Sequence, residues 1–192
     1  MARIRTFIAI ELARDLRDRL VALQETLGRS APDVKWVEPP SLHVTLLFLG
    51  EVEDRDLPAI CRAVQESVAG RAGFLITIDG VGCFPNRRRP RILWAGIGEG
   101  VQEVVAIHDA LEPPLLDLGC YRREERRYSP HVTLGRVRNG GPVSTATLTR
   151  ALDGQAGWKG GEQAVHTIHV MASELSPDGP AYTILARAPL AG

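Results

Sequence analysis

The sequence predicts an α+β protein with two pseudo-symmetric lobes, each a mainly antiparallel sheet with helices on its outer face, and a cleft between them. Three observations support this. Short strand-like runs alternate irregularly with amphipathic helical stripes. One strand motif occurs twice, nearly half a chain apart, and no long linker or low-complexity tract divides the chain. Residues 1–192 are therefore expected to form a single two-lobed domain, a size that suits one hydrophobic core.

The first part of the chain reads as strand, helix, strand, strand. Residues 4–10 are an apolar run typical of a buried strand. Leucines then recur every three or four residues, which indicates an amphipathic helix that Gly28 can end. A short strand over 34–38 is broken by Pro39 and Pro40 before the next strand. The helical stripe consists of Leu12, Leu16, Leu20, Leu23 and Leu27.

The middle of the chain predicts a second helix over 57–68, a strand over 74–78, a loop over 84–90 and a strand over 91–97. A third helix begins near Val101. Pro113 and Pro114 are expected to end or kink this third helix, because proline lacks the amide hydrogen that an interior position needs.

The end of the chain predicts a short helix and two strands. Ser144 can cap the helix, Leu148 and Leu152 face inward, and Gly154 closes it. Strands over 165–173 and 181–188 follow, joined by a turn over 177–180.

Composition excludes several classes of protein. Apolar residues make up 44% and charged residues 24%, and 23 basic residues balance 23 acidic ones. A strongly basic nucleic-acid binder is not indicated, so any attraction to phosphate must be local. The three cysteines show neither a disulfide framework nor zinc-ligand spacing. With no apolar run near the ~20 residues of a membrane span and no signal-peptide pattern, we expect a cytoplasmic protein without a membrane segment.

The repeated motif is His-Val-Thr-Leu, at His43 with Thr45 and again at His131 with Thr133. Each copy lies in a strand-like run, and side chains two positions apart on a strand project from the same face. Two such strands can place two imidazoles and two hydroxyls around one cavity. Four matching residues can also arise by coincidence, so the flanking sequence matters.

The flanks of both copies make the chain similar to a known group of enzymes. It resembles the two-histidine phosphoesterase superfamily and, within it, the bacterial and archaeal RNA 2′,3′-cyclic phosphodiesterases, historically called 2′-5′ RNA ligases. Besides the two motifs, the resemblance rests on residues 5–10, 36–40, 82–85, 90–96 and 173–175 and on Tyr182, which span most of the chain.

The resemblance implies hydrolysis of a 2′,3′-cyclic phosphate end on RNA or a nucleotide to a 2′-phosphate. It implies that His43 donates a proton to the leaving oxygen and that His131 accepts one from water. It also implies that Arg136 contacts the phosphate and Phe48 the nucleoside. Simple alternation along a strand opposes both of these contacts, because each residue lies five positions after its histidine; a bulge or strand end would have to re-aim them.

The residue types suit this chemistry. Hydrolysis of a cyclic phosphodiester needs a base for water and an acid for the sugar oxygen, and an imidazole with an ordinary pKa of about 6.5 serves as either. Thr45 and Thr133 can donate hydrogen bonds to the non-bridging oxygens. The scheme needs neither a metal ion nor another cofactor, and no metal-ligand spacing occurs. Residue types alone leave open which histidine is the acid.

Other functions stay open. The same proton transfers serve 2′-5′ ligation of RNA ends, and loops could select another small cyclic phosphate. A non-catalytic module that binds RNA ends would be indicated by loss of a motif, and both are intact. We expect the active unit to be a monomer.

The remaining histidines, arginines and aromatic residues have simpler interpretations. His108 fits the apolar side of a helix, and one of His166 and His169 could approach the cavity from a strand. Arginines cluster at 87–91 and at 122–127; both suit solvated loops, and the first is the better candidate for binding RNA phosphates, since Glu124 and Glu125 dilute the second. Trp36, Trp94 and Tyr128 could stack on bases, although burial is the simpler expectation for Trp94.

Overall fold

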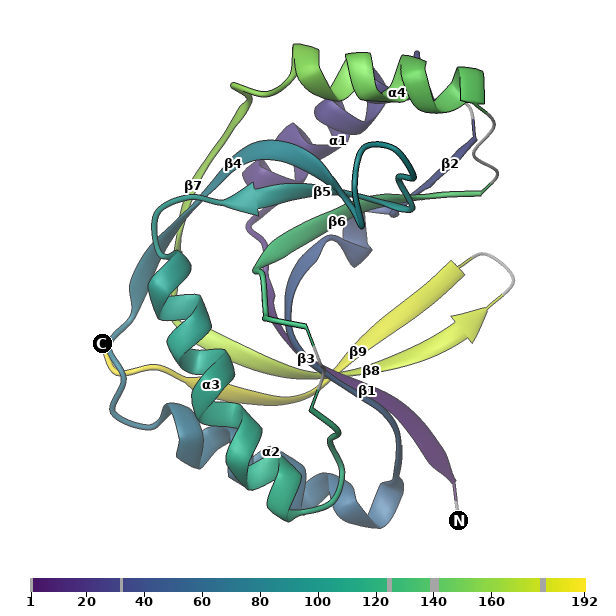
Figure 1. Cartoon of the computed structure of the whole chain (residues 1–192). Coiled ribbons are helices and arrows are strands. Elements are labelled where there is room, and N and C mark those ends of the chain that lie inside the picture. The colour runs from purple at the N-terminus through teal and green to yellow at the C-terminus, as the bar shows by residue number, and fades with distance from the viewer. Residues whose placement is uncertain (1, 32, 124–125, 139–141, 177–178) are drawn as a thin grey trace.

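The computed structural model describes residues 2–31, 33–123, 126–138, 142–176 and 179–192. Within these residues all the strands join one curled antiparallel sheet in the order β7-β4-β5-β6-β3-β1-β8-β9, with β2 paired to β6 (Figure 1). The strands are β1 (Arg3–Glu11), β2 (Val34–Trp36), β3 (His43–Glu53), β4 (Phe74–Phe84), β5 (Ile92–Ile97), β6 (His131–Val137), β7 (Lys159–Val165), β8 (Thr167–Ser176) and β9 (Gly179–Pro189).

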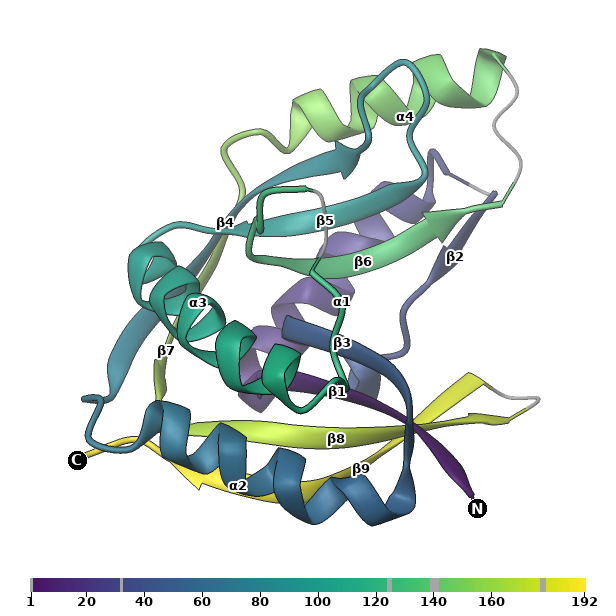
Figure 2. The same ribbon diagram turned by 60° about the horizontal axis from the view of Figure 1, so that its bottom comes forward.

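The sheet divides into two halves that diverge from the middle, as the sequence predicts (Figure 2). One half holds β1, β3, β8 and β9, and the other holds β4, β5, β6 and β7 together with β2. The halves meet where β3 pairs with β6 at a single register position, Val44 opposite Val132. The two lobes are therefore continuous through one short contact between the motif strands.

Each half is covered by two helices. α1 (Arg14–Gly28) and α4 (Pro142–Gly154) lie on the half that holds β7, and α2 (Leu57–Val68) and α3 (Val101–Asp117) lie together on the half that holds β3 and β9 (Figure 1). α1 follows β1 in sequence but covers the other half, and α3 likewise follows β5 and crosses over. This exchange of helices ties the lobes together.

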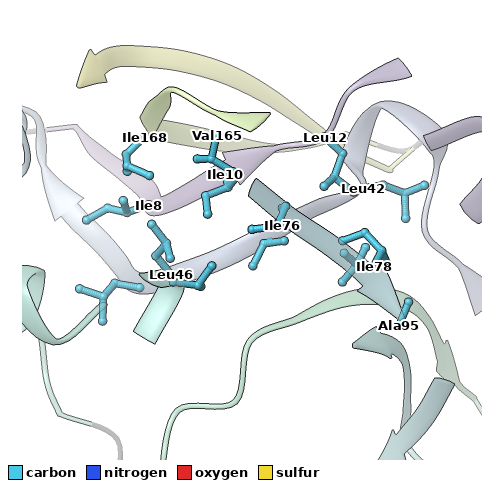
Figure 3. Packing of buried hydrophobic residues seen from close by; sticks show 14 of the residues in the cluster. Ile8, Ile10, Leu12, Leu42, Leu46, Ile76, Ile78, Ala95, Val165 and Ile168 are labelled. Carbon is cyan, nitrogen blue, oxygen red and sulfur yellow. The ribbon is translucent and has the colours of Figure 1, made fainter. Parts of the chain in front are cut away.

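One hydrophobic core fills the space between the sheet and the helices. Ile8 and Ile10 of β1, Leu46 of β3 and Ile76 and Ile78 of β4 are all at most 2% exposed and lie close together (Figure 3). At about 1.5–3 kcal/mol for each fully buried aliphatic side chain, this cluster stabilises both halves at once.

A second, smaller apolar cluster lies on the other face of β1 and β8. Phe7, Ala9 and Met171 are buried there, and Tyr182 and Ile184 pack against them. Alternation along β1 places Phe7 and Ala9 opposite the core residues, so this cluster lines the concave face between the halves.

The helices and strands differ from the sequence prediction at α3 and at β7. α3 continues through Pro113 and Pro114 to Asp117; each proline leaves one carbonyl of the preceding turn without its helical donor, and the buried Leu111 and Leu115 hold this part of the helix against the core. The glycine-containing strand β7 is absent from the sequence prediction, since its pairing partner β4 decides its conformation. The side chain of Ser144 and part of the predicted turn at 177–180 lie outside the described residues.

Candidate active site

The two motifs meet at the centre of the sheet. Val44 and Val132 pair directly and are fully buried toward the core. In an antiparallel pair centred there, His43 lies across from Thr133, and Thr45 lies across from His131. Since alternate side chains face opposite ways, these four project together from the concave face, where all are half-buried. Each end of the site thus has a histidine from one half and a threonine from the other.

Both histidines are oriented by a backbone carbonyl two residues earlier. His43 Nδ1 lies 2.8 Å from the carbonyl oxygen of Ser41, and His131 Nδ1 lies 2.8 Å from that of Ser129. A carbonyl only accepts, so each Nδ1 carries the hydrogen. This leaves each Nε2 free to hold or take a proton on the concave face. The shared Ser-x-His spacing signals this support, but the sequence interpretation missed it because the partner is main chain.

The two imidazoles have different neighbours. His43 Nε2 lies 2.9 Å from Thr45 Oγ1, and its ring centroid is 4.9 Å from Phe7 and 5.4 Å from Tyr182. His131 packs edge-to-face against Phe84, with ring centroids 5.1 Å apart. The aromatic rings hold both imidazoles in place and exclude water from one side of each.

Burial lowers the pKa of both histidines. For His43, burial is the largest influence. The hydrogen bond to Ser41 comes next and raises the pKa. Charge on His131 then lowers the pKa, and the Glu11 carboxylate raises it. Glu11 lies directly opposite His43 in the β1–β3 pair. For His131, burial comes first, then its carbonyl bond, which raises the pKa, and then Arg136, which lowers it. Each histidine therefore has a different charged neighbour.

A β-bulge occurs at the same place in both motifs. Between Ala9 and Ile8 of β1, strand β3 passes an extra residue, Leu46; between the corresponding positions of β5, strand β6 passes Leu134. The third and fourth residues after each histidine are consequently both buried, and the fifth is exposed.

The bulges return the fifth residues to the face that carries the histidines. Phe48 is 43% exposed, and the Arg5 guanidinium lies 4.7 Å from its ring centroid. Arg136 is exposed and lies close enough to act on two neighbours: its charge adds to the effect of burial in lowering the pKa of His131, and it opposes the effect of burial, which raises the pKa of Tyr182. Phe48 and Arg136 can therefore lie on the same face as the histidines, although simple alternation along a strand would place them on the opposite face. Their contacts with substrate remain predictions.

Tyr128 joins the two motifs through the backbone. Its hydroxyl donates to the carbonyl oxygen of Thr45 at 2.8 Å, and its ring stacks on His108 with centroids 4.0 Å apart. Burial raises the pKa of the Tyr128 hydroxyl. His108 is 8% exposed at the edge of the core, as its helical position indicates, and lies 2.9 Å from the Asp109 carboxylate. Tyr128 directly precedes Ser129, whose carbonyl orients His131. Its hydrogen bond to Thr45 therefore connects the two motif strands.

The two histidines near the last strands, His166 and His169, differ in burial and position. His166 is exposed. His169 is buried on the concave face, where its Nε2 lies 3.5 Å from a Glu11 carboxylate oxygen. Burial lowers the pKa of His169, and Glu11 raises it. His169 therefore belongs to the surroundings of the site through Glu11, two strands away from His43.

The two arginine clusters also differ in position. Arg87 forms an ion pair with Asp153 of α4, and the Asn86 side chain accepts hydrogen bonds from the amides of Arg88 and Arg89 at 3.0 and 3.1 Å. Arg126 and Arg127, in contrast, line a cavity next to His131. In the cluster that the sequence favoured, Arg87 is thus held by α4, and the Arg91 carbonyl accepts a hydrogen bond from the Val137 amide of β6 at 2.9 Å. Trp94 packs half-buried against Phe84, with ring centroids 5.3 Å apart.

Groups suited to metal binding and membrane insertion are not found in the described residues. They contain no group of three or more His, Cys, Asp or Glu side chains gathered around one point. Nor does any described helix have the length and apolar character needed to span a membrane. Cys61, Cys83 and Cys120 are free thiols.

Comparison with known proteins agrees with this geometry. Residues 10–94 match the model of the LigT-like phosphoesterase family. An RNA 2′,3′-cyclic phosphodiesterase of Methanothermobacter thermautotrophicus is 35% identical over 94% of this chain and 96% of its own length. The chain belongs to the LigT-like phosphoesterase family. A relative with the same name from Archaeoglobus fulgidus is 32% identical over 93% of this chain and 96% of its own.

Solved structures of this family share the fold. The protein TT0787 of Thermus thermophilus superposes with a TM-score of 0.77 at 29% identity, covering 97% of this chain and 98% of that one. Escherichia coli LigT complexed with 3′-AMP covers both chains completely with a TM-score of 0.78; at 24% identity it supports the fold alone. The superfamily and the two-lobed α+β fold that the sequence predicted are confirmed.

Proposed function

We propose that this protein is an enzyme that hydrolyses 2′,3′-cyclic phosphate ends of RNA or nucleotides to 2′-phosphates without a metal ion. The observation that carries the proposal is the Val44–Val132 pairing, which brings two imidazoles, each with its Nδ1 bonded to a backbone carbonyl, to one concave surface. The names of the family relatives add the substrate class.

In the proposed reaction, Nε2 of His131 accepts a proton from water as the water oxygen forms a bond to phosphorus. Nε2–H of His43 donates to the 3′ oxygen as the bond between phosphorus and that oxygen breaks. The products are a 2′-phosphate and a 3′-hydroxyl, and the two histidines then exchange protons with solvent to reset. Each proton transfer contributes roughly 10²–10⁴-fold to the rate.

The surroundings of the histidines support this direction. Burial is the largest influence on both histidines and lowers both pKa values; beyond it, Glu11 favours the charged form of His43, as an acid requires, and Arg136 favours the neutral form of His131, as a base requires. Environments that separate two otherwise similar groups in this way are how enzymes assign acid and base.

Thr45 and Thr133 are proposed to stabilise the phosphate. Thr45 Oγ1 lies 2.9 Å from His43 Nε2; once that Nε2–H is directed at the 3′ oxygen, the Thr45 hydroxyl can donate its hydrogen to a non-bridging oxygen. Arg136 is proposed to pair with the phosphate and Phe48 to contact the nucleoside. No cofactor is needed.

We further propose that residues 1–192 act as one domain and as a monomer in the cytoplasm. The single core cluster that spans both halves supports one domain. Both motifs lie in one chain, so a second subunit is not needed to complete the site. The three free thiols suit a reducing compartment.

The test is turnover of nucleoside 2′,3′-cyclic phosphates by purified protein in excess chelator, with the product isomer identified. Full activity and a 2′-phosphate product are expected. Loss of turnover in chelator with recovery on adding a divalent cation would contradict the two-histidine reaction, and a 3′-phosphate product would contradict the assigned leaving oxygen.

A further inference from the structure

A cavity of about 260 Å³ opens from the end of the site where Thr45 lies across from His131. One wall is strand β3 from Thr45 to Phe48, and Phe84 closes a second side. The opposite wall is the segment that leads into β6, including Arg126, Arg127 and Tyr128. The proposed reaction at the motifs uses only the mouth of this cavity.

The wall that carries the two arginines is anchored on both sides. Before them, the hydroxyl of Tyr121, a residue only 7% exposed, donates to a Glu112 carboxylate oxygen at 3.1 Å. After them, the Tyr128 hydroxyl donates to the Thr45 carbonyl at 2.8 Å. Described residues before and after Arg126 and Arg127 are thus hydrogen-bonded to the body of the protein.

The charge of the cavity wall is positive among the described residues. The one carboxylate in the lining, Glu112, lies 3.3 Å from Arg123 Nε, which balances it. Arg126 and Arg127 are exposed, and no carboxylate of the described residues forms an ion pair with either. The aromatic faces of Phe48 and Phe84 complete the surface. Arginines beside aromatic rings are the combination that binds single-stranded nucleic acid.

We propose that this cavity binds the RNA strand on the 5′ side of the cyclic end, with Arg126 and Arg127 pairing with the phosphodiester that precedes the terminal nucleoside. With the cyclic phosphate between the histidines and the terminal nucleoside at Phe48, the next backbone phosphate lies one nucleoside away, on the arginine side. The subsite rests on the proposed function, and it makes an oligoribonucleotide a better substrate than a nucleoside cyclic phosphate, which has no such phosphate.

The other arginine cluster does not compete for this role. Arg87 is neutralised by Asp153, and none of Arg87, Arg88 and Arg89 lines the cavity. Arg88 and Arg89 are likewise exposed and carry the same charge, so the pair provides a matched control for Arg126 and Arg127.

The experiment compares kcat/KM for a short oligoribonucleotide and for a nucleoside, both ending in a 2′,3′-cyclic phosphate. The wild type is expected to prefer the oligoribonucleotide, less so as salt rises, because phosphate contacts are screened. The double variant Arg126→Ala/Arg127→Ala should reduce this preference by about tenfold or more, the effect of losing charge-assisted hydrogen bonds. Arg88→Ala/Arg89→Ala should retain it.

A binding measurement separates this subsite from the proposed reaction. Fluorescence anisotropy with a labelled oligoribonucleotide ending in a 2′-phosphate needs no turnover, and the same loss of about tenfold is expected in the Arg126/Arg127 variant only. An unchanged preference and affinity in that variant, or an equal loss in the control, would overturn the subsite. If the wild type binds the oligoribonucleotide through these arginines but hydrolyses neither substrate, the proposed reaction fails and the subsite stands.

Discussion

The two motif strands share the sequence His-Val-Thr-Leu, the same carbonyl support and the same bulge, yet their surroundings differ. The first histidine, His43, is enclosed by Phe7 and Tyr182, bonded to Thr45 and placed opposite Glu11. The second, His131, packs against Phe84, and the charge on Arg136 adds to burial in lowering its pKa. A repeated backbone can thus position two equal groups, while side chains from neighbouring strands surround them with different charges.

The most severe test of this pairing removes each imidazole. His43→Ala and His131→Ala should each lower kcat/KM by at least about 10²-fold, because one displacement needs both proton transfers. The double variant should lose less than the product of the two single losses, since the pair acts as a unit. His166→Ala, an exposed histidine away from the motifs, is the control. Near-normal turnover by either single variant would reduce that motif to a structural repeat.

The threonines test whether the two ends of the site are equivalent. Thr45→Val and Thr133→Val keep the side-chain shape but remove the hydroxyl, and each should lower kcat/KM by about 10- to 100-fold through a lost hydrogen bond to a charged group. Thr45→Val should be the more damaging, since Thr45 also bonds His43. Serine at either position should restore most of the activity. Wild-type kinetics in a valine variant would assign that threonine to structure alone.

The pH dependence of activity tests whether the charged neighbours of the two histidines affect their pKa values. Because burial lowers the pKa of both histidines, the profile of kcat/KM should be bell-shaped with its optimum on the acid side of about 6.5. Arg136 lowers the pKa of His131, so Arg136→Ala should raise that pKa and move the acid limb to higher pH. Arg136→Lys, which keeps the charge, should leave the limb in place. An acid limb that does not move in the alanine variant would remove Arg136 from the electrostatics of His131.

The smallest expected effect concerns the link between the motifs. Tyr128→Phe removes the hydrogen bond to the Thr45 carbonyl but keeps the stacked ring, so a loss of about 2- to 10-fold is expected from one neutral hydrogen bond. With a nucleoside 2′,3′-cyclic phosphate, which does not reach the proposed Arg126/Arg127 subsite, the loss should fall on kcat rather than KM, because Tyr128 positions Thr45. A rise in KM with unchanged kcat would instead indicate contact with substrate.

Many of the helices and strands, and the four motif residues, can be predicted from the sequence because they depend on patterns of neighbouring residues. The apolar runs predict the strands, the leucine stripe predicts α1, and the repeated His-x-Thr identifies the four residues that meet across Val44 and Val132. What the sequence does not reveal depends on pairing between distant strands. Leu46 and Leu134 occupy bulges, but nothing in their own sequence distinguishes a bulged leucine from a paired one.

Contacts between residues far apart in the chain could not be predicted from the sequence either. The sequence cannot show that Tyr128 donates to the carbonyl of a residue 83 positions away, nor that Arg126 and Arg127 border a cavity while Arg87 is held by α4. In each case a residue type predicted a possible role, and tertiary contacts selected between alternatives.

The pairing of Val44 with Val132 also defines a local dyad perpendicular to the sheet, since antiparallel strands are related by a two-fold rotation at each pair. A phosphorus atom above this pair would lie on the axis, and reversing the substrate would exchange the histidines without altering the backbone. A ribose is not symmetric, so its direction must be chosen by residues that break the symmetry. The fifth residue after each histidine does so most plainly: of the two positions that the dyad relates, one holds the aromatic ring of Phe48 and the other the guanidinium of Arg136.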